Sequence, residues 1–138
     1  MGTRCNIEIY DKWSEDWSCG VILYHHSDGY PDFMKGKLKR FLEKTFEILT
    51  EAGYPYWWDS ERVAAVMIML SIEDYENPLL PFSTNRSNSF EPRDPYRPNE
   101  GIPVFQPCLK LHGDIEYIYR IRLDPEKNGK FTISQKKV

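Results

Sequence analysis

A chain of 138 residues is long enough for one ordinary domain and too short for two. With 41% hydrophobic and 28% charged residues, the composition excludes a disordered protein, and no apolar run is long enough to span a membrane. The formal net charge of −3 excludes a uniformly basic protein, so the overall charge does not favour nucleic acid as a partner.

Charge is distributed unevenly along the chain. Through Glu76 there are 8 Lys and Arg against 14 Asp and Glu, and from Asn77 onward there are 10 against 7. The first part therefore carries a net charge of −6 and the second a net charge of +3. A mildly basic second part is compatible with an anionic ligand.

The N-terminus and the cysteines favour a cytoplasmic location. Residues 1–8 lack the apolar core of a signal peptide. The odd set of three cysteines, Cys5, Cys19 and Cys108, fits reduced thiols in a protein that is not exported.

The chain begins with the pattern of a β-hairpin. Residues 6–10 alternate polar and apolar side chains, as a half-buried strand does, and residues 21–26 form the next β-rich run. The segment between them, residues 11–20, is longer than a tight turn and carries Trp13 and Trp17. It is therefore expected to be a loop.

Two helices are expected next. Asp32 is placed to cap the first, in which apolar residues recur at intervals of three and four until Gly53. An aromatic connector at residues 54–58 leads to the second, which Asp59 or Ser60 would cap. The second helix is apolar nearly all round, so it is expected to be the more buried of the two.

Residues 77–107 hold seven of the ten prolines and are expected to form a long loop, because proline removes backbone donors. Short strands follow at residues 108–111 and 131–134, and residues 115–123 have the clearest strand alternation in the chain. The last residues, 135–138, are expected to fray.

The order of a strand pair, a helix pair, a long loop and a strand triplet predicts a single α+β domain over residues 1–138. No strand–helix–strand alternation requires parallel pairing. We therefore expect an antiparallel sheet of about five strands, made of an N-terminal hairpin plus a C-terminal three-stranded meander, packed with two helices.

Two segments carry a resemblance. The chain opens with Met-Gly-Thr-Arg at residues 1–4 and has Tyr-His-His-Ser-Asp-Gly-Tyr-Pro at residues 24–31, before the first helix. This arrangement resembles a group of small uncharacterised bacterial and bacteriophage proteins, and residues 112–117 resemble a late strand of that group. The resemblance implies a self-contained domain associated with mobile genetic elements. It carries over no activity and no catalytic residue.

The histidine turn offers one catalytic arrangement. His26 beside Asp28 could act as an acid or base near neutral pH, with Arg4 or Arg120 stabilising developing negative charge. This predicts a small hydrolase or nuclease-like enzyme for a phosphorylated or nucleotide substrate. The structural alternative is that Asp28 and Gly29 only make the turn.

Arginines, histidines and nearby polar residues offer a binding site for an anion instead. Arginine forks suit phosphate, and the proline-rich loop places arginines beside aromatic residues that could stack on bases. The candidate ligand-binding residues are Arg4, His25, Tyr30, Arg86, Arg93, Arg97, His112, Asp114, Glu116 and Arg120.

No metal and no cofactor are expected. Cys108 and His112, and Cys19 and His25, lack the paired spacing of zinc ligands. A cysteine nucleophile, Cys5 or Cys19, is a further alternative, although cysteines in small domains usually pack as small hydrophobic residues.

The leading hypothesis is a non-enzymatic binding module, associated with phage or other mobile elements, that engages a protein or an anionic ligand. The loop at 77–107 and the turn at 27–31 would make the contact. The small enzyme is the alternative. A third hypothesis is a homo-oligomer that associates through its four tryptophans, Trp13, Trp17, Trp57 and Trp58.

Overall fold

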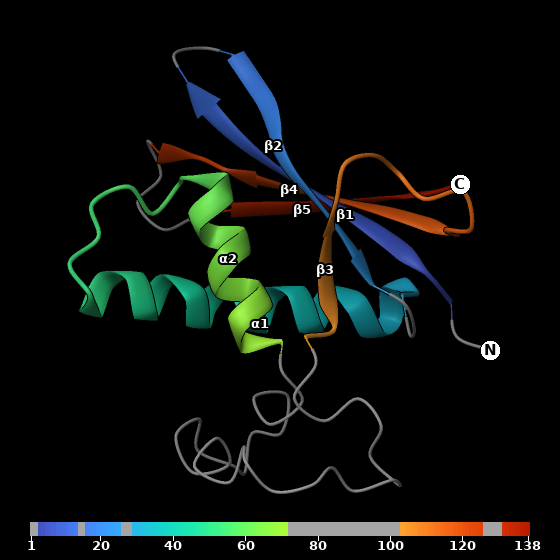
Figure 1. Cartoon of the computed structure of the whole chain (residues 1–138), viewed down its shortest axis with the longest axis horizontal. Helices are drawn as coiled ribbons and strands as arrows, with labels where there is room; N and C mark the ends of the chain where they lie inside the picture. Colours follow the sequence, from blue (N-terminus) through green and yellow to red (C-terminus); the bar gives the residue numbers. More distant parts are fainter. Residues whose placement is uncertain (1–2, 14–15, 26–28, 72–102, 126–130) are drawn as a thin grey trace, which may run out of the picture.

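The structure is a computed structural model, and it describes residues 3–13, 16–25, 29–71, 103–125 and 131–138. Two helices lie on one face of a five-stranded sheet (Figure 1). Along the chain the elements are β1 (Cys5–Trp13), β2 (Asp16–His25), α1 (Pro31–Glu51), α2 (Ser60–Leu70), β3 (Phe105–Cys108), β4 (Tyr117–Leu123) and β5 (Phe131–Lys137). This is an α+β fold with the expected number of strands and helices.

The sheet is mixed rather than purely antiparallel. Its strand order is β3-β2-β1-β4-β5, and β4 runs parallel to β1, whereas the other neighbours are antiparallel. The predicted C-terminal three-stranded meander is therefore wrong. β4 and β5 do form a hairpin, but β3 pairs with β2 at the opposite edge. Residues 109–116 must then lead from that edge to β4, which lies beyond both β2 and β1.

The β1–β2 hairpin is longer than the sequence pattern predicted. Residues 11–20 are not a loop, because both strands continue to Trp13 and Asp16. Val21 pairs with Ile9 and Cys19 with Tyr10, which leaves Gly20 as the extra residue of a β-bulge. The bulge shifts the alternation of β2 by one residue, and this shift hides the strand from a search for period two.

Strand boundaries at the C-terminal end also differ from the expectation. β3 begins at Phe105, so the predicted loop at 77–107 does not extend to its stated end, and the expected strand at 108–111 is displaced. The tail does not fray, because β5 continues to Lys137 and the Val138 amide donates to the Glu116 carbonyl at 2.8 Å.

The helices agree more closely with the sequence pattern than the strands do. α1 covers the predicted stripe, but it starts at Pro31 with Tyr30 as N-cap, so Asp32 lies in the first turn and does not cap. Asp59 caps α2, and its carboxylate accepts from the Glu61 and Arg62 amides at 3.1 and 3.3 Å.

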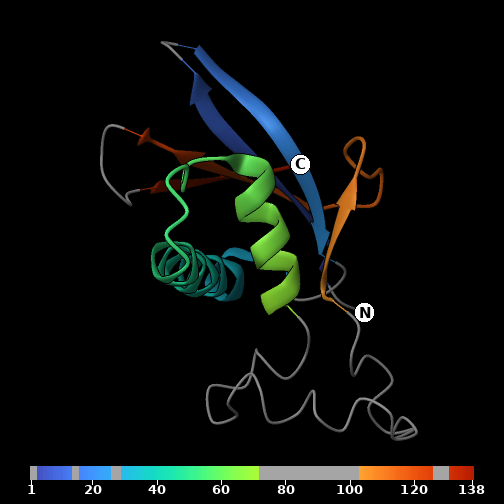
Figure 2. The same cartoon turned by 60° about the vertical axis from the view of Figure 1, so that its left-hand side comes forward.

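Both helices lie on the same side of the sheet in Figures 1 and 2, and the core fills the space between them and that face. Each fully buried aliphatic side chain contributes about 1.5–3 kcal/mol to folding. The sheet supplies Ile7, Ile9, Leu23, Ile121 and Leu123, α1 supplies Met34, Leu38 and Leu42, and α2 supplies Val63, Met67 and Leu70. α2 is the more buried of the two helices, as expected, since five of its eleven residues are buried against seven of twenty-one in α1, although Met69 is 37% exposed. Within the described ranges, no helix is long and apolar enough to cross a membrane.

A buried carboxylate attaches α2 to the hairpin. Asp11 Oδ2 accepts from the Ser60 hydroxyl at 2.6 Å and from the Ser60 amide at 3.2 Å, and Ser18 donates to Oδ1 at 3.4 Å. Ser60 is the first residue of α2, so the carboxylate also faces the positive end of the helix. The contact is close because the bulge residue opposite is Gly20, where a Cβ atom would overlap Ser60 Oγ.

We expect Gly20→Ala to lower the free energy of unfolding by about 1–3 kcal/mol, because the added methyl group displaces the Ser60 hydroxyl from Asp11. Chemical denaturation measures the loss. Gly113→Ala is the matched control, because nothing lies within 4 Å of its Cβ position, and it should change stability by less than about 0.5 kcal/mol. Equal effects of the two substitutions would contradict the assignment.

Candidate functional site

Five of the twelve predicted site residues lie outside the part of the chain that the structure describes. The proposed acid–base pair, His26 and Asp28, and the loop arginines Arg86, Arg93 and Arg97 lie outside the described residues. Their roles stay predictions. The other seven predicted residues are described, and four of them gather at one end of the sheet, whereas His25, Tyr30 and Arg120 lie elsewhere.

His25 lies on the helix-covered face of the sheet, opposite Cys5. Its Nε2 atom is 3.1 Å from Nζ of Lys37, and both side chains are buried. Three phenyl rings surround the ammonium group, with centroids 5.5 Å away for Phe33, 6.0 Å for Phe41 and 5.8 Å for Phe105. Cation–π attraction therefore helps to offset the cost of burying the charge.

Lys37 was missed by the sequence reasoning, although its spacing carried a signal. Phe33, Lys37 and Phe41 are four residues apart on α1, so they share one face of the helix. Phe105 completes the surroundings from β3, and that contact is not visible in the sequence. Tyr30, another predicted ligand residue, is exposed at the start of α1, 6.4 Å from the Phe33 ring.

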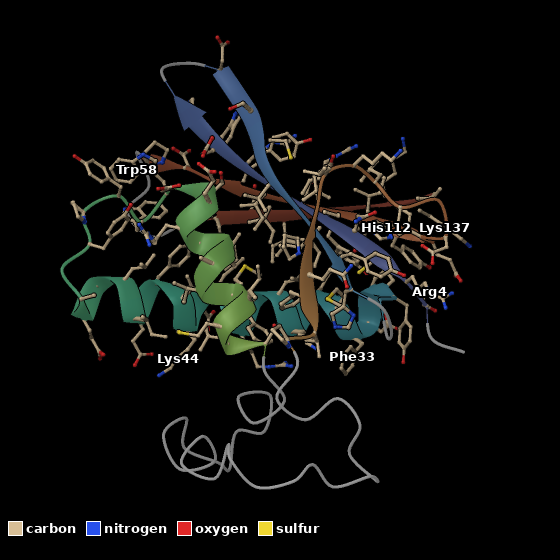
Figure 3. The ribbon with its side chains drawn as sticks, viewed as in Figure 1. Arg4, Phe33, Lys44, Trp58, His112 and Lys137 are labelled. Carbon is tan, nitrogen blue, oxygen red and sulfur yellow. The ribbon has the colours of Figure 1, made fainter. Side chains whose placement is uncertain are left out.

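Four of the predicted residues do gather, at one end of the sheet. The His112 ring stacks on Tyr24 with centroids 4.0 Å apart, and the Tyr24 hydroxyl donates to Asp114 at 3.1 Å. Arg4 Nε lies 3.3 Å from the same carboxylate oxygen. The Glu116 amide donates to the Arg4 carbonyl at 2.9 Å, while its side chain is exposed. Figure 3 shows Arg4 and His112 at this end.

These contacts mainly hold the connection 109–116 against the sheet. Buried Asn6 donates to the Leu23 carbonyl at 3.0 Å and to Cys108 Sγ at 3.4 Å, and it accepts from the His112 amide at 2.8 Å. Ile115, within the connection, is buried against Tyr24 and Ile118 of the sheet. Arg4, His112 and Asp114 therefore lie together because they attach this connection to the sheet, and their proximity requires no ligand.

The open face of the sheet, opposite the helices, carries a ladder of charged and aromatic residues. Arg120 Nε lies 2.8 Å from Glu8 Oε1, and the Tyr10 hydroxyl donates to the same oxygen at 3.2 Å. The Arg122 guanidinium lies 5.4 Å from the Tyr10 ring centroid. Burial, and then Glu8, raises the pKa of Tyr10, and the hydrogen bond to Glu8 raises the pKa of Arg120.

Strand register places this ladder in cross-strand rows. Glu8 is opposite Arg120, Tyr10 is opposite Arg122, and Lys12 is opposite Trp17, whose ring centroid is 5.7 Å from the lysine nitrogen. Lys136 joins the same face from β5, opposite Ile118. We call the following six residues the cationic face: Tyr10, Lys12, Trp17, Arg120, Arg122 and Lys136.

The cationic face has a charge opposite to that of the whole protein. It holds four cations, and among the described strand positions of this sheet face Glu8 is the one acid, so the local net charge is +3. Because the whole chain carries −3, the remainder carries −6. Sequence reasoning had singled out Arg120 but did not bring these residues together, since they come from four strands.

Trp17 does not share a surface with Trp57 and Trp58. Trp17 is 37% exposed on the open face of β2, so its placement on a loop was wrong. Trp57 and Trp58 lie in the connector between the helices, with ring centroids 5.6 Å apart, and pack against the core (Figure 3 labels Trp58). The three tryptophans whose side chains are described therefore do not form a shared interface.

The described cysteines do not form an activated nucleophile. Burial raises the pKa of Cys5 to about 12, and burial also raises the pKa values of Cys19 and Cys108. A raised pKa disfavours the reactive thiolate. Among the residues that the structure describes, no group of three His, Cys, Asp or Glu could hold a metal ion.

No family model matches the chain, and comparisons with curated proteins and with solved structures likewise found no match. The resemblance to bacterial and bacteriophage proteins stays a prediction.

A thiol-specific reagent such as Ellman's reagent should modify exposed Cys19 first and Cys5 only on unfolding, because the pKa of Cys5 is about 12. The raised pKa also sets a sign for stability. Cys5 favours the folded state below its usual pKa of 9.0, and this contribution is lost as pH rises toward 12. Cys5→Ala should remove the slow thiol. Labelling of Cys5 as fast as Cys19 in the native protein would contradict its burial.

Proposed function

We propose that the protein is a non-enzymatic binding module that takes an anionic ligand on the cationic face. The observation that supports the proposal is the charge separation, with +3 on the open face of the sheet and −6 on the rest of the chain. Separation of charge raises the local concentration of an oppositely charged ligand and its rate of association. The helices cover the other face, so the open face is the one that offers a broad surface (Figure 2).

The side chains of the cationic face are held in place without being fully neutralised. Glu8 pairs with Nε of Arg120 at 2.8 Å and accepts from the Tyr10 hydroxyl at 3.2 Å, so one carboxylate fixes both side chains. Tyr10 supports the guanidinium of Arg122 through its ring, so that group keeps its full charge. Prepositioned arginines lose less entropy when they bind an anion.

The contribution of any single cation is small. An exposed ion pair gives about 0.2–1 kcal/mol and is screened by salt, so an effective site needs several cations acting on one ligand. Four cations on adjacent strands fit a ligand with several negative charges better than a single small anion.

The alternative, a small hydrolase or nuclease-like enzyme, has less support. Its proposed charge-stabilising residues, Arg4 and Arg120, lie beside Asp114 and Glu8. Its proposed histidine–aspartate pair falls outside the described residues. A cytoplasmic location and an association with phage or mobile elements belong to the proposal and are tested by fractionation and by the genes next to the coding sequence.

Charge reversal tests the proposed function. The double variant Lys12→Glu/Arg122→Glu should bind polyanions at least about tenfold more weakly, because both cations lie on the cationic face. Lys35→Glu/Lys39→Glu is the matched control, since it makes the same charge change on exposed positions of α1. The panel is heparin, polyglutamate, polyphosphate and a thymidine 15-mer, measured at two salt concentrations. Equal losses in the two variants for every probe would refute the proposed site.

A further inference from the structure

We infer that the ligand of the cationic face is a single-stranded nucleic acid, with bases stacked on Tyr10 and Trp17 and phosphates paired with the surrounding cations. This inference rests on the proposed function and names its substrate class. It also revises the expectation from the overall charge, because the relevant quantity is the local charge of +3 and not the total of −3.

The aromatic residues separate nucleic acid from other polyanions. Each ring on this face is paired with a cation, Tyr10 with Arg122 at 5.4 Å and Trp17 with Lys12 at 5.7 Å. A sulfated sugar or an acidic peptide would use the cations, but it has no flat base to place on the rings. Proteins that bind single strands combine these two elements, a positive track and aromatic platforms.

The spacing along the strands suits a repeating ligand. Same-face residues two apart in a strand are separated by about 6.6–6.8 Å, which gives regular steps from Glu8 through Tyr10 to Lys12 and from Arg120 to Arg122. The rings of Tyr10 and Trp17 are thus one such step apart along β1, because Trp17 lies opposite Lys12, two residues after Tyr10. A single strand can unstack its bases to meet both rings, whereas a duplex keeps its bases paired inside.

Residues at both ends of the cationic face would contact the ligand. Lys12 and Trp17 lie on the hairpin, which projects beyond β4 and β5 in Figure 1, and Lys136 lies on the edge strand β5. Exposed Thr132 and Ser134 point to the same face from β5 and can donate hydrogen bonds to phosphate or base oxygens. The surface between these ends crosses β1, β4 and β5.

The experiment uses the full chain and labelled thymidine 15-mers in fluorescence anisotropy. The intact oligonucleotide should bind more tightly than an abasic 15-mer of the same charge, because stacking contributes only when bases are present. The logarithm of the binding constant should fall with the logarithm of salt concentration with a slope no steeper than about −3, as expected for up to four phosphate contacts on a single strand.

Two ring substitutions separate stacking from charge. Tyr10→Leu and Trp17→Leu should each weaken thymidine binding roughly tenfold and weaken heparin binding clearly less, because heparin loses only the support that each ring gives its cation, while Trp17→Phe, which keeps a ring, should lose less thymidine binding. If Trp17→Leu unfolds, Trp17→Phe replaces it as the test of stacking. Far-UV circular dichroism checks the fold of each variant. A thermal melt of every variant accompanies the binding measurement.

Three results would overturn the inference. They are equal binding of the abasic and intact oligonucleotides, tighter binding of a 15-base-pair duplex than of the single strand, and binding confined to heparin, polyphosphate or polyglutamate. If any of these comes with loss of polyanion binding in Lys12→Glu/Arg122→Glu, the proposed function stands and only the ligand class fails. If no probe binds through the cationic face, both fail.

Discussion

The carboxylate of Asp11 at the first turn of α2 is the contact on which the arrangement depends. A buried carboxylate is stable only when donors surround it, and Ser60 and Ser18 supply them. The helix terminus adds its own favourable field. Gly20 makes the approach close enough, since any side chain there would overlap Ser60. Through this contact the hairpin and α2 hold each other, and α2 then packs beside α1 over one face of the sheet.

The strand β1 serves both faces at once. Ile7, Ile9 and Asp11 point toward the helices, where they are buried. Glu8, Tyr10 and Lys12 alternate with them, so they must point to the open face. The residues that fix α2 and those that build the cationic face are therefore neighbours in sequence. The same backbone register orders both, which gives the open face a defined geometry although no helix covers it.

The elements that sequence patterns predicted well are those with local causes. The apolar stripe of α1 repeats over five turns, and the Asp59 cap needs only the amides two and three residues later. The failures have non-local causes. A single bulge residue, Gly20, reversed the alternation of β2, and the pairing of β3 with β2 joins residues that are eighty or more positions apart.

The sequence by itself determined the α+β class, both helices, the approximate strands and the total charge of −3. Only the tertiary structure decided which side chains share a surface. Arg120 and Arg122 could be assigned to one side of a strand from alternation, but their neighbours Glu8 and Tyr10 come from a parallel strand that begins 112 residues earlier. The net charge is a sum over the chain and is the same in any fold, whereas the electrostatic potential at a surface depends on the distances between the charged side chains there. The cationic face therefore exists only because β4 pairs with β1.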